Sequence, residues 1–177
     1  AGIDPSAEVV LLDPTRDGVE QIAEVLAGRS GIDAIHIVSH GSQAELQLGT
    51  ARLTLDSMTG RYADKLATIG QALTDEGDIL VYGCNFGEGG PGQEAAARLA
   101  AKTGADVAAS EDLSGHAKLG GDWDLEFRAG AIETTDAYSE QAQTHWEGLL
   151  DTVAVDTTND EDDGNTSTSA NHSTNKT

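Results

Sequence analysis

Short apolar runs alternate with longer amphipathic segments through the first 150 residues of the chain. Apolar runs of this length predict buried strands when they end at turn-forming residues such as Gly, Pro, Asp or Ser. Residues 45–55 alternate in polarity on both sides of a Gly-Thr pair, which predicts a β-hairpin. Residues 122–127 alternate in the same way and predict a half-exposed strand. The expected buried strands lie at residues 9–12, 34–38, 78–82 and 106–109.

Apolar residues at helical spacing fill the segments between these strands. The first expected helix is capped by Asp17, the second begins near Asp56 or Arg61, and the third begins at Pro91. Strands that alternate with helices of 10–15 residues are typical of a mostly parallel sheet with helices on both faces. The sequence therefore predicts an α/β fold, a three-layer α/β/α sandwich. The expected helices cover residues 17–28, 56–73 and 91–102.

The composition of the chain changes at Leu150. Residues 151–177 contain no aromatic residue and consist mainly of Asp, Asn, Ser and Thr. A segment of this kind cannot bury enough apolar surface to offset its ordering entropy. We therefore expect one domain at residues 1–150 and an acidic, Ser/Thr/Asn-rich disordered tail or linker at residues 151–177.

The charge of the chain narrows its possible partners and its location. Asp and Glu number 31 against 10 Lys and Arg, giving a net charge of −21. This charge speaks against nucleic acid and anionic membrane surfaces, and no apolar run suggests membrane insertion. It fits a secreted or cell-surface prokaryotic protein, among others one from a saline habitat, although a merely soluble acidic domain is an alternative. Because the chain starts at Ala1, we expect it to be a processed chain or an excerpt.

Two residues with chemical potential follow two of the expected strands. His40 comes shortly after strand 34–38, and Cys84 comes shortly after strand 78–82. If these strands are parallel neighbours about 4.8 Å apart, the imidazole can take the thiol proton and leave a thiolate nucleophile. The backbone N–H groups of Gly41 and Cys84 are then candidates for an oxyanion hole. The alternative is a buried structural cysteine and a hydrogen-bonded loop histidine.

Several blocks of the sequence resemble a known family. Residues 35–41 (IHIVSHG) and 79–85 (ILVYGCN) resemble the catalytic blocks of the caspase, gingipain and separase clan of cysteine peptidases. Together with residues 9–13, 104–110 and 120–125, they are similar to the DUF4347 family, found in large bacterial surface proteins with adhesin-type repeats. The resemblance implies a caspase-like fold in which His40 is the general base and Cys84 the nucleophile.

The resemblance also implies a substrate preference and a function. An acid at the end of the following strand, Asp112 or Glu111, would select Arg or Lys in the substrate, whereas in so acidic a chain both are equally expected as ordinary surface residues. The implied function is a cysteine peptidase-like domain that processes its own polypeptide or a neighbouring surface protein. The alternative is a catalytically inactive binding or structural module of an adhesin. We expect no cofactor and no metal, because the His and Cys residues lack the spacing of zinc ligands.

Overall fold

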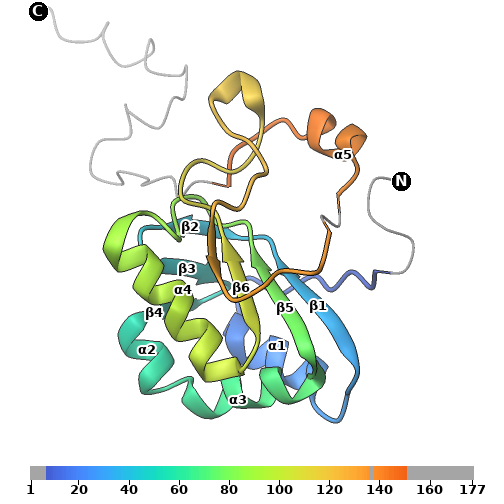
Figure 1. The fold of residues 1–177 in the computed structure, drawn as a ribbon, viewed down its shortest axis with the longest axis vertical. Helices are drawn as coiled ribbons and strands as arrows, with labels where there is room; N and C mark the ends of the chain where they lie inside the picture. The colour runs from blue at the N-terminus through green and yellow to red at the C-terminus, as the bar shows by residue number, and fades with distance from the viewer. Residues whose placement is uncertain (1–6, 136–137, 151–177) are drawn as a thin grey trace, which may run out of the picture.

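A computed structural model describes residues 7–135 and 138–150 of the chain. At its centre lies a four-stranded sheet in the order β1-β5-β6-β7 (Figure 1). Strands β1 (Ile32–Ile37), β5 (Leu73–Val81) and β6 (Asp106–Ala109) are parallel, and β7 (Phe127–Ala129) is antiparallel to β6. The predicted α/β class with a mostly parallel sheet is therefore confirmed.

Three helices pack on one face of this sheet. They are α1 (Gly18–Leu26), α3 (Ala63–Ala72) and α4 (Gly89–Thr103). Side chains alternate between the two faces of a strand, so Ile79 and Val81 of β5 point towards these helices and join their apolar residues in the main core. Each helix packs against the sheet because it has an apolar stripe along one side that is buried there.

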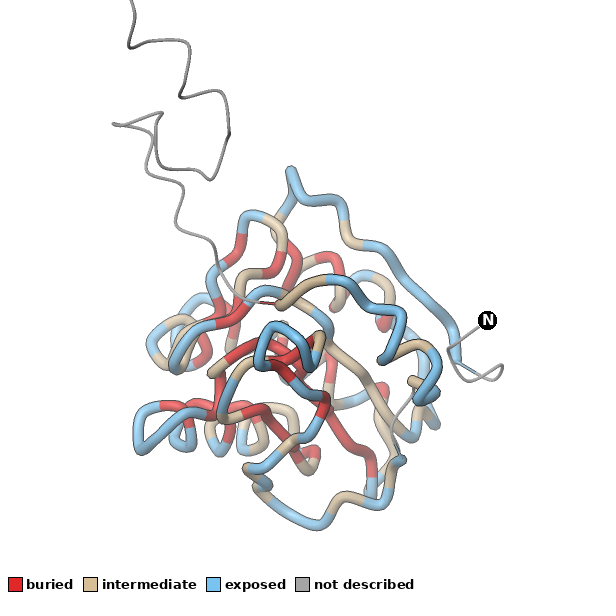
Figure 2. The backbone as a smooth tube through the Cα atoms, turned by 90° about the horizontal axis from the view of Figure 1, so that it is seen from above, coloured by how far each residue is buried: buried red, intermediate tan, exposed pale blue. Residues whose placement is uncertain are grey.

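The opposite face of the sheet is covered differently. Leu80, Tyr82 and Cys84 contribute to a second apolar cluster, together with Trp123 and Leu150 of the segment that follows β6. That segment is largely irregular and includes the short helices η1 (Ala117–Leu119) and α5 (Glu140–His145). Figure 2 shows buried positions concentrated in the centre of the molecule and exposed ones along the outer loops. This mixed arrangement, with helices flanking the sheet, is compatible with the predicted three-layer fold.

A small antiparallel sheet follows β1 in the chain. It contains β2 (His40–Ser42), β3 (Glu45–Leu48) and β4 (Ala51–Thr54), and the pairing of β3 with β4 confirms the predicted hairpin. Helix α2 (Leu55–Thr59) follows directly. The expected long helix at residues 56–73 is instead divided into α2 and α3, because the chain leaves helical geometry at Gly60.

Asp17 begins α1 as predicted. Its carboxylate accepts hydrogen bonds from the Glu20 N–H and, at 2.7 Å, from the Tyr62 hydroxyl, and it pairs with Arg61 at 2.8 Å. Burial alone would raise the pKa of Asp17, but these hydrogen bonds and the guanidinium outweigh it and hold the pKa below its usual value. Burial and the neighbouring carboxylate raise the pKa of Tyr62 to about 12. This network ties the start of α1 to the start of α3.

Two strand predictions were wrong in detail. Residues 9–12 do not form a strand, and Val9 and Leu11 are 60% and 90% exposed. A strand needs a neighbouring strand for its backbone hydrogen bonds, and an apolar run alone does not provide one. The expected strand at residues 122–127 begins only at Phe127, and Asp122 instead forms an isolated bridge with Ser114. The expected tail at residues 151–177 lies outside the described residues. Within the described residues, no helix has the length and apolar character needed to cross a membrane.

Candidate functional site

The ends of β1 and β5 lie side by side. Ile37 stands opposite Val81 in the parallel ladder, and His40 and Cys84 each follow three residues later. The backbones meet closely at this point, because a Cβ atom on Gly41 would lie 2.8 Å from the Cys84 carbonyl oxygen. Glycine at position 41 therefore permits the approach of the two segments. The structure brings the His-Gly and Gly-Cys blocks to one edge of the sheet, where ligands bind in open α/β folds.

The Cys84 thiol is buried, with 0% of the residue exposed. Its sulfur accepts a hydrogen bond from the Ser114 N–H at 3.2 Å, and the thiol donates to the Ser114 carbonyl oxygen at 3.5 Å. The N–H group favours negative charge on the sulfur, whereas the surrounding apolar side chains disfavour it. The sequence did not reveal Ser114 as a site residue, because it acts through its backbone and any residue type offers the same groups.

His40 is the first residue of β2 and is exposed. Its backbone pairs with Gln47 of β3, which fixes the position of the segment but leaves the imidazole at the surface. Among the described residues, no hydrogen bond joins the His40 ring to the Cys84 sulfur. The predicted base and nucleophile thus lie on adjacent backbone segments, and the Cys84 sulfur is hydrogen-bonded to the backbone of Ser114.

Gly41, the predicted oxyanion donor, is hydrogen-bonded to a peptide carbonyl group. Its N–H donates to the carbonyl oxygen of Leu150 at 3.2 Å. The Leu150 N–H donates to the Ser114 carbonyl oxygen at 2.9 Å, the same oxygen that accepts from the Cys84 thiol. Leu150 is only 6% exposed and belongs to the apolar cluster that contains Cys84. The chain therefore covers its own candidate nucleophile, a feature that no pattern in the sequence predicted.

The predicted acidic residues lie near this edge but face different partners. The Asp112 carbonyl oxygen accepts the Asn85 N–H at 2.7 Å, which places Asp112 beside the Cys84 loop. Partial burial, reinforced by nearby carboxylates, raises the pKa of Asp112. The side chain of Glu111 instead accepts a hydrogen bond from Gln93 of α4. Of the two, Asp112 is the acid whose backbone is bonded to the loop that carries the thiol.

Two groups of carboxylates in the described residues are close enough to share a cation. Asp112, Asp122 and Glu126 form an exposed group near Cys84. Asp78 forms the second group with Asp106 and Glu133, and its Oδ2 atom accepts the Glu133 and Thr134 N–H groups. Asp106 likewise accepts the Ala131 N–H. The second group therefore fastens residues 131–134 onto the sheet, so its hydrogen bonds have a structural explanation.

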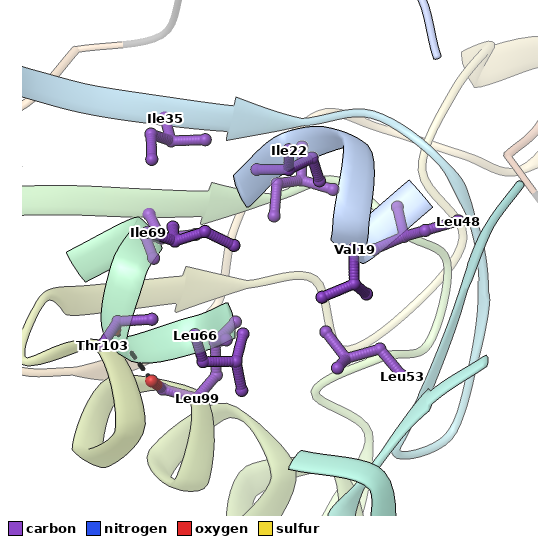
Figure 3. Close-up of a pocket in the computed structure, with 11 residues that line it drawn as sticks. Val19, Ile22, Ile35, Leu48, Leu53, Leu66, Ile69, Leu99 and Thr103 are labelled. Atoms are coloured by element: carbon purple, nitrogen blue, oxygen red, sulfur yellow. Dashed lines mark hydrogen bonds between the residues drawn. The ribbon is translucent and has the colours of Figure 1, made fainter. Parts of the chain in front are cut away.

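The pocket drawn in Figure 3 belongs to the main core and not to the candidate site. It lies between the helices and the sheet, and its lining includes Val19, Ile35 and Ile69. Thr103 is the polar residue of this lining, and its hydroxyl is already bonded to the Leu99 carbonyl oxygen. A substrate site needs convergent polar groups, so this pocket is explained by packing.

Comparison with known proteins gives one match. A family model described as a domain of unknown function, DUF4347, matches residues 1–150. No curated protein and no solved structure matches the chain. The family suggested by the sequence blocks is therefore confirmed, while the similarity to the caspase clan stays a prediction.

Proposed function

The chain belongs to the DUF4347 family, and on that premise we propose that residues 1–150 form a cysteine peptidase-like domain with His40 and Cys84 as its dyad. The substrate is a polypeptide, either the chain itself or a neighbouring surface protein. The setting is a large secreted or cell-surface adhesin with further repeats, which agrees with the net charge of −21. The domain uses no metal or organic cofactor in this reaction.

One observation carries the proposal. The blocks that resemble the catalytic segments of the clan contain the ends of the neighbouring parallel strands β1 and β5. His40 and Cys84 each lie three residues beyond the Ile37–Val81 pair, and Gly41 lies against the Gly83–Cys84 backbone. The imidazole at this edge takes the thiol proton, and the thiolate attacks a peptide carbonyl carbon. The N–H groups of Gly41 and Cys84 stabilise the oxyanion. That the Gly41 N–H is already bonded to a peptide carbonyl supports its part in this scheme.

A second candidate is an inactive binding or structural module. It is favoured by the complete burial of Cys84 and by the exposure of the His40 ring, since a working dyad needs the two side chains within hydrogen-bond reach. On this alternative, the fold is retained as a scaffold and the thiol is a packing residue. The two candidates differ in a single measurable property, which is whether chain processing depends on the thiol.

The experiment follows the mass of the full chain after refolding, in wild type, Cys84→Ala and His40→Gln. His145→Gln is the matched control, because His145 is exposed and bonds within its own helix. The peptidase proposal expects fragments in wild type and in the control, and an intact chain in both dyad variants. Fragments that form equally in wild type and Cys84→Ala would overturn the proposal in favour of the inactive module.

A further inference from the structure

We infer that the bond cleaved by Cys84 is in the same chain, between Leu150 and Asp151. This inference rests on the proposed function and names its substrate. It begins with Leu150, the residue whose carbonyl group lies on the Gly41 N–H. In a peptidase, the carbonyl held by the oxyanion donor is the carbonyl of the scissile bond.

The residues before this carbonyl are seated as an added strand. The His116 N–H donates to the Gly148 carbonyl oxygen, and the Leu150 N–H donates to the Ser114 carbonyl oxygen, both at 2.9 Å. Gly115 and Leu149 form an antiparallel bridge between these two bonds. Peptide substrates commonly bind in this way, through main-chain hydrogen bonds to an extended segment of the enzyme. Residues 148–150 thus bind residues 114–116 as a substrate strand would.

The thiol is located at the end of this strand. The Ser114 carbonyl oxygen accepts from both the Leu150 N–H and the Cys84 thiol, so the nucleophile and the amide of Leu150 meet at one atom. Gly41, which binds the Leu150 carbonyl oxygen, also touches the Cys84 backbone. Leu150 therefore contacts the two segments that flank the thiol. Leu150 is also one of the residues of the apolar cluster that buries Cys84, so the proposed substrate contributes to covering the nucleophile.

The side chain of Leu150 points to an apolar preference. Leu150 is buried in a cluster that includes Leu80, Ala108 and Trp123, and none of these residues offers a carboxylate to pair with a positive charge. Asp112 is exposed and lies outside this cluster. We therefore assign the position before the scissile bond to leucine, in contrast to the Arg or Lys that the resemblance implied.

The chemistry of the step balances with water as co-reactant. His40 accepts the thiol proton, and a bond forms between the Cys84 sulfur and the Leu150 carbonyl carbon. The bond from that carbon to the Asp151 nitrogen breaks, and the imidazolium gives its proton to the departing amine. Water then hydrolyses the thioester, which leaves a carboxylate on Leu150 and restores the thiol.

The test follows the refolded full chain by intact mass and by sequencing of new N-termini. We expect a new N-terminus at Asp151 in wild type, formed at a rate independent of protein concentration, and none in Cys84→Ala. Leu150→Met should retain cleavage, whereas Leu150→Arg should slow it by at least about tenfold. Far-UV circular dichroism confirms that each variant is folded. Faster cleavage of Leu150→Arg would overturn the apolar preference.

A leucine-based acyloxymethyl ketone, which alkylates an activated thiol, separates the two levels of the proposal. Cleavage that depends on Cys84 but occurs at another bond overturns this inference and leaves the proposed function standing. Labelling of Cys84 without any cleavage likewise overturns this inference and leaves the proposed function standing. Absence of both labelling and cleavage overturns the proposed function as well.

Discussion

Replacement of Leu150 by alanine should expose the Cys84 thiol and make it reactive. Leu150 is 6% exposed, and its backbone joins Gly41 to Ser114 directly beside the thiol. In Leu150→Ala, the hydrogen bonds remain possible, but most of the apolar surface that holds the segment in place is lost. The segment should therefore detach more often, and each detachment exposes the sulfur to reagent.

The size of the effect follows from the burial of the side chain. Replacement of a buried Leu by Ala costs about 2–5 kcal/mol, and the lower value applies where the surroundings can collapse, as at this edge of the domain. A cost of about 2 kcal/mol raises the population of the detached state by about 30-fold. When detachment and return are fast relative to the reagent, the reaction rate rises by the same factor.

The assay measures the rate at which an aromatic disulfide reagent modifies Cys84, the single cysteine of the chain, under native conditions. Leu119→Ala is the control for a surface change, because Leu119 is 53% exposed. Leu66→Ala is the control for general destabilisation, because Leu66 is buried in the main core on the other face of the sheet. Rapid modification of the wild type, or an equal rise in Leu66→Ala and Leu150→Ala, would refute local detachment as the cause.

Three further predictions concern the stability of the fold. The pKa of the Asp17 carboxyl is held below its usual value, so its stabilising effect is present above about pH 4 and is lost as the pH falls through the folded-state pKa. Asn caps a helix as well as Asp does, so Asp17→Asn loses the charge-assisted bonds to Tyr62 and Arg61, about 1 kcal/mol at pH 7, and this difference should shrink in acid denaturation curves. Gly41→Ala should lower the melting temperature by several degrees, because its Cβ would lie 2.8 Å from backbone atoms, whereas Gly90→Ala, with nothing within 4 Å, should not. Asp78→Ala should destabilise the domain by about 2 kcal/mol in urea titrations, because two N–H groups lose their acceptor, while Asp75→Ala at an exposed position should be neutral.

The sequence was sufficient to predict that the backbone segments carrying His40 and Cys84 lie side by side, but not where the two side chains point. Buried strands carry a strong local signal, and the chain direction of parallel strands brings their carboxyl ends to one edge. The same reasoning predicted β6, the hairpin and the cap of α1 at Asp17. These features depend on local residue patterns and on the geometry shared by all parallel sheets.

The cover over the thiol could not be predicted in this way. Ser114 and Gly148 contribute only backbone groups, and a backbone group leaves no mark on residue type. Leu150 belongs to a short apolar pair with Leu149, which is too short to show the repeating pattern that indicates a strand. The error at residues 9–12 has the related cause that a strand needs a partner, and pairing is a property of the whole fold.

The two candidate functions can be successive states of one molecule. Within the described part of the chain, the backbone hydrogen bonds that hold residues 148–150 involve groups on the N-terminal side of the Leu150–Asp151 bond, including the Leu150 carbonyl oxygen on the Gly41 N–H. Cleavage of that bond removes none of these interactions, and the buried side chain of Leu150 stays with the domain. The new carboxylate would therefore remain at the site and keep the thiol covered. On this proposal, the domain cuts once in its own chain and then persists as a closed, inactive module. The wild type should therefore release residues 151–177 and yet fail to hydrolyse an added leucyl peptide.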